Sequence, residues 1–266
     1  MPERRQLPIA LTIAGSDSGG GAGVQADLKT FAALGVHGTS AITCLTAQNP
    51  QGVSAIQAAK PAMVRAQVEA IFAELRPAAV KTGMLFDAAI IREVAAFLRA
   101  LRGSKPPIIV DPVMVATSGA RLLKPAALRA LRGELLPLAT LITPNLDEAE
   151  ILVGAKLKSV GDLRAAAQAI HAGFGCPALV KGGHLRSARE AVDVFFDGRH
   201  ELLLTAPFVR GVSTHGTGCT YSAAIAAYCA LGHELPSAVQ LAKDFITRAI
   251  AQSYRIGRHS ALHPLA

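Results

Sequence analysis

Short apolar segments alternate along the chain with longer amphipathic segments that are rich in alanine. The apolar segments are typical of buried strands and the amphipathic ones of helices. Strands are predicted over Ile9–Ala14, Thr39–Thr46, Ala78–Thr82, Ile108–Val110, Leu141–Thr143 and Ala178–Lys181. The helices predicted between them cover Val24–Leu34, Ala62–Leu75, Ala88–Leu101, Ala126–Leu131 and Val160–Ala172. Because this alternation is typical of βαβ units, it predicts an α/β fold with a mostly parallel central sheet flanked by helices.

The pattern changes near the end of the chain. Two short β-rich segments, Val192–Phe196 and Glu201–Thr205, flank an Asp-Gly pair and predict a small β-hairpin. Two helices follow, from about Gly216 and from about Pro236. The chain has no long linker, low-complexity tract or internal repeat, so a single domain over residues 1–266 is expected.

The bulk composition narrows the class of protein. Hydrophobic residues make up 51% of the chain, much of it alanine, but no apolar run approaches the ~20 residues of a membrane span. The N-terminal residues lead directly into a predicted strand without a signal-peptide arrangement, so a cytoplasmic protein is expected. The four cysteines (Cys44, Cys176, Cys219 and Cys229) lack metal-ligand spacing and a disulfide pattern, which favours reduced thiols.

The net charge of +8 raises the question of nucleic-acid binding. The Lys and Arg residues are scattered over many predicted elements rather than gathered in a stripe, and aromatic residues make up only 5% of the chain. Nucleic-acid binding is therefore disfavoured. A positive field that attracts a small polyphosphate is equally compatible with this charge.

Unusual polar residues follow nearly every predicted parallel strand. They lie in Gly15–Asp17, Gln48-Asn49, Lys81–Met84, Asp111-Pro112, Thr143–Asn145 and Lys181–His184. Ligands of such sheets bind outside the carboxyl ends of the strands, where these residues would meet. Their shared position predicts an enzyme with its site at this edge.

A Gly-rich turn, Ser213–Thr220, leads into the first of the two late helices. Unpaired amides and the helix dipole at such a turn suit a phosphate or an oxyanion, and glycines allow close approach. Cys219 would lie in the first helical turn, where the same field predicts a lowered thiol pKa. An ordinary capped helix with a small buried cysteine is the alternative.

Two familiar phosphate motifs do not fit the chain. Gly21–Ala26 matches a loose dinucleotide fingerprint, but its loop is too long and the following strand lacks the acidic residue for a ribose. Gly211 and Gly216 have Walker A spacing, but Thr217 stands where that motif needs Lys. Phosphate binding at a helix N-terminus remains. Asp111 and the Asn145–Glu148 segment offer oxygen ligands for Mg²⁺, although Asn145 also fits a plain helix cap.

The chain resembles the hydroxymethylpyrimidine/phosphomethylpyrimidine kinases, within the ribokinase-like superfamily, from about Ala10 to about Leu231. The matching stretches are Leu11–Asp17, Gly20–Thr30, Leu45–Asn49, Lys81–Met84, Asp111–Met114, Thr143–Leu146, Val180–His184 and His215–Cys219. The resemblance implies a three-layer sandwich and an ATP-dependent kinase. Such a kinase phosphorylates the hydroxymethyl group of 4-amino-5-hydroxymethyl-2-methylpyrimidine, and then its monophosphate, to make the pyrophosphate for thiamine biosynthesis. It further implies Mg²⁺ with ATP, a monovalent cation as a candidate cofactor, and a homodimer.

The same resemblance assigns roles to individual positions. The pyrimidine pocket would contain Gly15, Asp27, Gln48, Met84 and Val113, and the ATP site Thr143, Asn145 and Lys181. Asp111 and Glu148 would act around the metal, Gly216, Thr217 and Gly218 would form the anion hole, and Cys219 would accept the hydroxyl proton. His215 would contact a substrate phosphate or shape the turn.

Two rival functions share most of these features. A vitamin B6 kinase of the same superfamily acts on another flat heterocycle with a hydroxymethyl group, and only pocket residues such as Gln48 and Met84 favour the pyrimidine. A non-catalytic pyrimidine-binding protein would have no need for Cys219, Asp111 and Glu148. Two positions depart from the family pattern: Asp147 replaces a proline and Tyr221 replaces an aliphatic residue.

Overall fold

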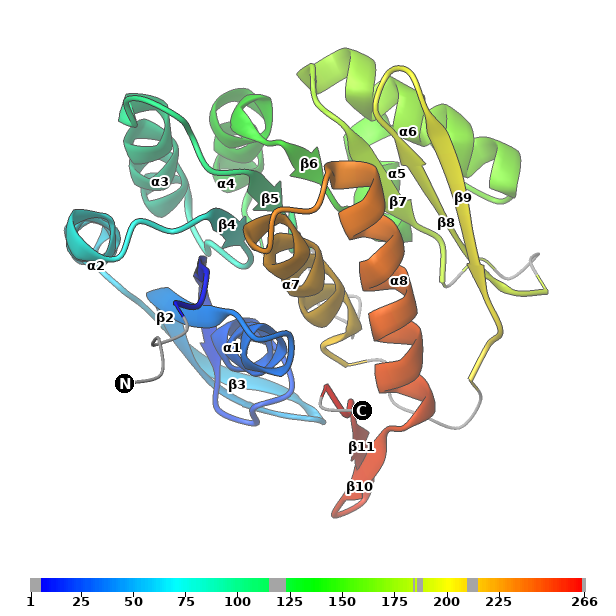
Figure 1. Cartoon of the computed structure of the whole chain (residues 1–266), viewed down its shortest axis with the longest axis horizontal. Helices are drawn as coiled ribbons and strands as arrows, with labels where there is room; N and C mark the ends of the chain where they lie inside the picture. The colour runs from blue at the N-terminus through cyan, green and yellow to red at the C-terminus, as the bar shows by residue number, and fades with distance from the viewer. Residues whose placement is uncertain (1–5, 115–122, 184, 186–188, 210–214, 265–266) are drawn as a thin grey trace.

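The computed structural model describes residues 6–114, 123–183, 185, 189–209 and 215–264. A nine-stranded sheet forms its centre, in the order β3-β2-β1-β4-β5-β6-β7-β8-β9 (Figure 1). The strands are β1 (Ile9–Asp17), β2 (His37–Asn49), β3 (Gly52–Ala58), β4 (Ala79–Thr82), β5 (Ile108–Val110), β6 (Leu141–Ile142), β7 (Ala178–Lys181), β8 (Ala191–Phe196) and β9 (Glu201–Ala206). A separate hairpin, β10 (Tyr254–Ile256) and β11 (His259–Ala261), lies near the C-terminus.

Helices cover both faces of this sheet. They are α1 (Gly23–Ala33), α2 (Pro61–Glu74), α3 (Ala88–Ala100), α4 (Pro125–Ala130), α5 (Leu146–Val153), α6 (Val160–Phe174), α7 (Thr217–Ala230) and α8 (Leu235–Ala251). A π-helical turn (Leu131–Leu135) and a 3₁₀ turn (Leu136–Leu138) follow α4. None of the helices among the described residues is both long and apolar enough to span a membrane.

Neighbouring residues of the central strands enter opposite halves of the core. Val80, Ile142 and Val180 pack with α2, α3, α4, α5 and α6 on one face. Ala79, Leu141 and Leu179 pack with α1, α7 and α8 on the other. Because each strand buries both of its faces, the strands are apolar throughout. Helix α7 packs against β1, β4 and β5, with α1 and α8 beside it on the same face of the sheet (Figure 1). Most of its side chains are buried, which accounts for its lack of a polar face.

The six strands β1, β2, β4, β5, β6 and β7 are parallel, so their carboxyl ends meet at one edge of the sheet. The antiparallel pairs lie at the two sides, where β3 joins β2 and the β8–β9 hairpin joins β7. The predicted α/β sandwich with a mostly parallel sheet and a late hairpin is confirmed. Every strand and helix predicted from the sequence pattern is present, with ends shifted by a few residues.

Three strands escaped the sequence pattern. All seven residues of β3 are exposed, so this edge strand lacks the apolar signal of the central strands. Hairpin β10–β11 consists of two three-residue strands that are only partly buried or exposed. Strands whose residues are exposed or only partly buried carry little hydrophobic pattern.

Candidate active site

A buried carboxylate and a lysine lie at the carboxyl edge of the sheet, beside the start of α7. Lys181 Nζ lies 3.0 Å from Asp111 Oδ1, and Thr143 Oγ1 lies 3.4 Å from the same oxygen. The hydroxyl of Ser222, on α7, donates to Asp111 Oδ2 at 3.3 Å. Burial alone would lower the pKa of Lys181, but the carboxylates of Asp111 and Glu148 raise it above the ordinary value. Lys181 therefore keeps its charge at this edge.

The Gly-rich turn places the N-terminus of α7 at the same edge. Gly216 has φ +81°, a left-handed conformation that favours glycine, and a Cβ on it would overlap the carbonyl oxygen of Gly21. The Thr220 amide donates to the Gly216 carbonyl. The amides of Thr217, Gly218 and Cys219 therefore come before the first hydrogen bond of the helix. A Cβ on Gly218 would lie 3.3 Å from Lys181 Nζ. The turn, Lys181 and Asp111 are thus brought together, while Ser213 and Thr214 lie outside the described residues.

The Cys219 thiol does not have the lowered pKa that its place at a helix N-terminus predicts. Burial is the largest effect and raises the pKa to about 11. The charge of Lys81 and a hydrogen bond from the Gly23 amide act in the opposite direction, whereas the charges of Asp27 and Asp111 raise the pKa further. The helix dipole is a field of partial charges, and it does not outweigh the removal of the thiolate from water.

Asp27 does not line an open pocket in this structure. Its side chain is fully buried, with Oδ2 2.8 Å from Lys81 Nζ and 2.6 Å from Thr12 Oγ1. Lys81 is also fully buried, and a Cβ on Gly83 would lie 2.9 Å from its Nζ. Asp27 therefore forms an internal ion pair beside the thiol of Cys219 in this structure, and its contact with a ring nitrogen stays a prediction. The sequence pattern assigns Lys81 no role, because a lysine at a strand end is usually exposed.

Asn145 and Glu148 form a capping box at the start of α5. Asn145 Oδ1 accepts from the Glu148 amide, and Glu148 Oε2 accepts from the Asn145 amide, both at 2.9 Å. The other Glu148 oxygen accepts from the Met114 amide at 3.0 Å. Burial, and next the charge of Asp111, raise the pKa of Glu148 to about 7. The plain helix cap considered for Asn145 is present, and it holds Glu148 close enough to Asp111 for their charges to repel.

The described residues contain no ready cluster of three or more metal-ligating side chains. Asp111 and Glu148 are nevertheless two buried carboxylates whose charges repel, and hard oxygen ligands of this kind suit Mg²⁺. Since Mg²⁺ keeps several waters and binds substrate phosphates, two carboxylates are a fitting protein contribution.

Of the other residues expected around the pyrimidine, Gly15 and Met84 lie close together. A Cβ on Gly15 would lie 2.7 Å from the sulfur of Cys44 and 3.9 Å from Met84 Cβ, so only glycine fits there. Met84, Val113 and Gln48 are partly exposed, as a ligand contact requires. Val113 has a positive φ of 40°, a strained conformation for a β-branched residue directly after the Asp111-Pro112 strand end.

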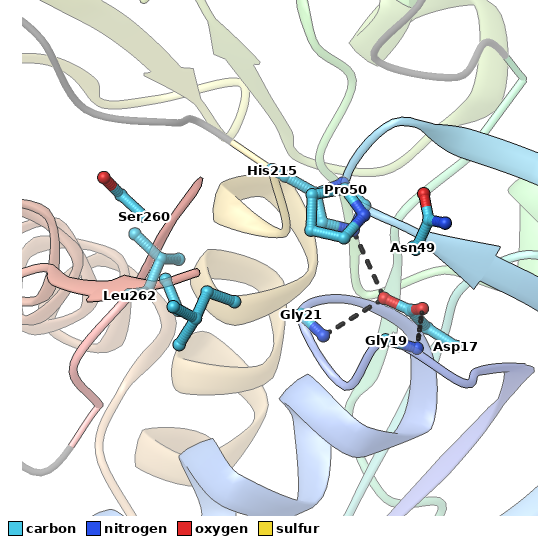
Figure 2. A pocket seen from close by; sticks show the side chains of 10 residues that line it. Asp17, Gly19, Gly21, Asn49, Pro50, His215, Ser260 and Leu262 are labelled. Carbon is cyan, nitrogen blue, oxygen red and sulfur yellow. Dashed lines mark hydrogen bonds and ion pairs between the residues drawn. The ribbon is translucent and has the colours of Figure 1, made fainter. Parts of the chain in front are cut away.

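His215 connects three segments around the site. Its Nε2 lies 3.2 Å from Asp17 Oδ2 (Figure 2). The same nitrogen lies 3.4 Å from Gln48 Nε2. Asp17 also accepts from the amides of Gly19, Gly21 and Ala22, and so organises the β1–α1 loop. Burial alone would raise the pKa of Asp17, but His215 and the amides of Gly19 and Ala22 outweigh it, and the pKa is lowered.

A small cavity lies beside the Asp17–His215 pair. Figure 2 shows Leu262 and Ser260 on its far side, so the segment that follows β10 forms one of its walls. The sequence pattern places Asp17 at the site edge but does not predict its bond to His215. No short-range pattern links two residues so far apart in the chain.

The structure is a mostly parallel α/β sandwich. One edge of its sheet combines a Gly-rich turn suited to an anion with two largely buried lysines and several carboxylates. This combination is typical of an enzyme that transfers phosphate to small molecules. A family profile described as phosphomethylpyrimidine kinase matches residues 17–263. A hydroxymethylpyrimidine/phosphomethylpyrimidine kinase of Synechococcus elongatus is 48% identical over 252 residues, 95% of either chain. The chain belongs to the phosphomethylpyrimidine kinase family, as its motifs predict.

Solved structures of two related kinds of kinase have the same fold. The phosphomethylpyrimidine kinase of Clostridium difficile 630 is 43% identical, with a TM-score of 0.81 over 91% of this chain and 99% of that one. The pyridoxal kinase of Bacillus subtilis, in an ADP complex, is 39% identical, with a TM-score of 0.87 over 97% of either chain. Fold similarity alone therefore does not separate the two substrate classes.

Proposed function

We propose that this protein is an ATP-dependent kinase that phosphorylates the hydroxymethyl group of 4-amino-5-hydroxymethyl-2-methylpyrimidine and then its monophosphate. The observation that carries this proposal is the Gly216–Cys219 turn, which meets Lys181 and Asp111 at one sheet edge. Membership of the phosphomethylpyrimidine kinase family supports the substrate. The product would be the pyrimidine pyrophosphate used in thiamine biosynthesis.

The amides of Thr217, Gly218 and Cys219 would bind the transferring phosphoryl group, because they precede the first hydrogen bond of α7. Lys181 is charged and reaches the same place, so it would hold ATP phosphates. Thr143 and Asn145 would act in the same ATP site. Thr143 contacts the Asp111 carboxylate that Lys181 also binds, and the backbone of Asn145 pairs with that of Lys181.

Asp111 and Glu148 would hold Mg²⁺, which when bound to ATP neutralises charge that develops on the phosphates. The capping box with Asn145 would hold Glu148 in place for this role. A monovalent cation is a further candidate cofactor of the family.

On the substrate side, Gly15, Met84 and Val113 would border the ring, and the Gln48 amide would pair with its polar edge. Met84 provides a polarizable contact for an aromatic heterocycle. Cys219 would face the hydroxymethyl group and accept its proton. Because its pKa of about 11 leaves the thiol protonated at neutral pH, the thiolate would be a minor species, stabilised by Lys81 and the Gly23 amide. A loose transition state tolerates this, since little proton transfer is needed before the phosphoryl group moves.

A vitamin B6 kinase is the second candidate, because the Bacillus subtilis pyridoxal kinase is similar over 97% of the chain. The deciding experiment measures ATP consumption with hydroxymethylpyrimidine, its monophosphate, pyridoxal, pyridoxine and pyridoxamine in parallel. Turnover of the first two compounds is expected, with much slower turnover of the other three. Turnover of the three vitamers alone would make vitamin B6, and not the pyrimidine, the substrate. Nucleotide and pyrimidine binding without any turnover would make the protein a binding module.

A homodimer in the cytoplasm fits the family, and the sheet offers a surface for it. Strand β3 is an exposed edge, and β2, β3 and the start of α2 carry several exposed apolar side chains: Leu45, Val53, Ile56 and Met63. Exposed edges and apolar patches are common sites of chain association.

A further inference from the structure

A buried ion pair lies on the far side of Lys181 from Asp111. Lys243 of α8 places its Nζ 2.7 Å from Asp193 Oδ2 of β8. Only 3% of Asp193 and 7% of Lys243 are exposed to solvent. Taking two charges out of water is costly, and such a pair is a weak source of stability compared with apolar packing. Its presence needs another explanation.

The second oxygen of Asp193 fixes the turn that follows Lys181. Asp193 Oδ1 accepts a hydrogen bond from the Gly182 amide at 3.0 Å. A Cβ on Gly182 would overlap the Val192 carbonyl oxygen, so the backbone has no room to shift toward β8. The carboxylate thus ties the end of β7 to α8.

Asp193 is also a direct competitor for Lys181. The two residues are paired across the antiparallel β7–β8 ladder, so their side chains leave the same face of the sheet at neighbouring positions. Lys181 nevertheless binds Asp111, on the opposite side, at 3.0 Å. Asp193 instead forms its ion pair with Lys243. The charge of Asp193 is also felt by the buried Tyr221 on α7, whose pKa is raised by burial first and by Asp193 next.

We propose that Lys243 is a positioning residue for nucleotide binding: by neutralising Asp193, it leaves Lys181 directed at Asp111 and the start of α7. The inference rests on the proposed function, because it takes Lys181 as a group that binds ATP phosphates. Lys243 itself lies on α8, behind the sheet edge, and acts only through Asp193. Without it, Asp193 would be an uncompensated buried carboxylate opposite Lys181 in the β7–β8 ladder.

The test compares Lys243→Met, Asp193→Asn and the double variant with the wild type, with Lys156→Met as the control. Lys156→Met also removes a lysine from an ion pair, the one with Glu150, but Lys156 is exposed on the surface. The readouts are ADP affinity by calorimetry and the separate KM values for ATP and for hydroxymethylpyrimidine. Thermal unfolding identifies variants that are not folded at the assay temperature. Should Lys243→Met fail to fold, Lys243→Gln removes the charge but keeps a hydrogen-bond donor.

Lys243→Met is expected to weaken ADP binding and raise the KM for ATP by about tenfold, the loss of one charged hydrogen bond, with little change in the KM for the pyrimidine. The double variant is expected to restore ADP affinity, because the amide side chain that replaces the Asp193 carboxylate still accepts from Gly182 but no longer competes for Lys181. Asp193→Asn and Lys156→Met should bind ADP like the wild type.

Three outcomes would each overturn the proposal: unchanged ADP affinity in folded Lys243→Met, no rescue in the double variant, or an equal rise of both KM values. A wild type that binds ADP but turns over none of the pyrimidines would count against the proposed function and leave the calorimetric comparison valid.

Discussion

At the scale of single residues, Cys219 shows what a local motif can and cannot predict. Its place in the first turn of α7 follows from the Gly-Thr-Gly-Cys sequence, but its pKa depends on groups from three other segments: α1, β4 and the end of β5. Lys81, Asp27 and Asp111 come from segments far apart in the chain, and burial exceeds all of them. A pKa is a property of the assembled site, so the local motif predicts the position of the thiol correctly and the direction of its pKa shift wrongly.

The replacement Cys219→Ala is expected to retain binding of both substrates and to lose most turnover, because it removes the proton acceptor without filling the pocket. Substrate affinity by calorimetry and initial rates measure the two effects separately. In the wild type, alkylation of Cys219 by iodoacetamide should increase about tenfold per pH unit until the pH approaches the pKa of about 11. A Cys219→Ala enzyme as fast as the wild type would remove the base assignment, and a thiol that is fully reactive at pH ~8 would contradict the raised pKa.

Gln48 belongs to the same scale, because its amide is the polar group expected at the ring. Gln48→Ala should weaken pyrimidine binding by about tenfold or more, since it leaves a polar ring edge unpaired, and should leave ATP binding nearly unchanged. His215 and Thr46, which contact this amide, remain in the variant. Separate titrations with pyrimidine and with ADP measure the difference. Equal losses for both ligands would exclude Gln48 from the ring pocket.

At the scale of elements, the start of α7 is determined by close backbone contact. Gly216→Ala would drive a Cβ into the Gly21 carbonyl oxygen and force a left-handed conformation on alanine, so the turn must move away from the β1–α1 loop. We expect a large loss of activity and a lowered melting temperature. Gly173→Ala in α6 is the matched control, because a Cβ there meets nothing within 4 Å and alanine favours a helix. If the two variants unfold and react alike, the close contact at Gly216 has no functional importance.

The elements also show why part of the site could be predicted from the sequence. Parallel strands with apolar residues on both faces fix where their carboxyl ends lie, so Asp111, Thr143 and Lys181 could be placed together before any contact was known. The internal pairing of Asp27 with Lys81 could not, because two charged side chains with no exposed surface look the same in sequence as two exposed ones. Edge strand β3 was missed for a related reason. All of its side chains are exposed, so it has no buried apolar face and no hydrophobic pattern.

At the scale of the whole molecule, the proposed homodimer would form at the β3 edge of the sheet. Leu45 on β2 and Met63 on α2 are 53% and 58% exposed, and both lie at the β3 side of the sheet. Sedimentation of the wild type is expected to give a dimer, and Leu45→Glu with Met63→Glu should shift it to a monomer, because burying unpaired carboxylates in an interface is costly. Leu203→Glu is the control, since Leu203 is 45% exposed on β9 at the opposite side of the sheet and should leave the dimer intact. A monomeric wild type would exclude the homodimer, and a dimer that survives the double substitution but not Leu203→Glu would move the interface to β9.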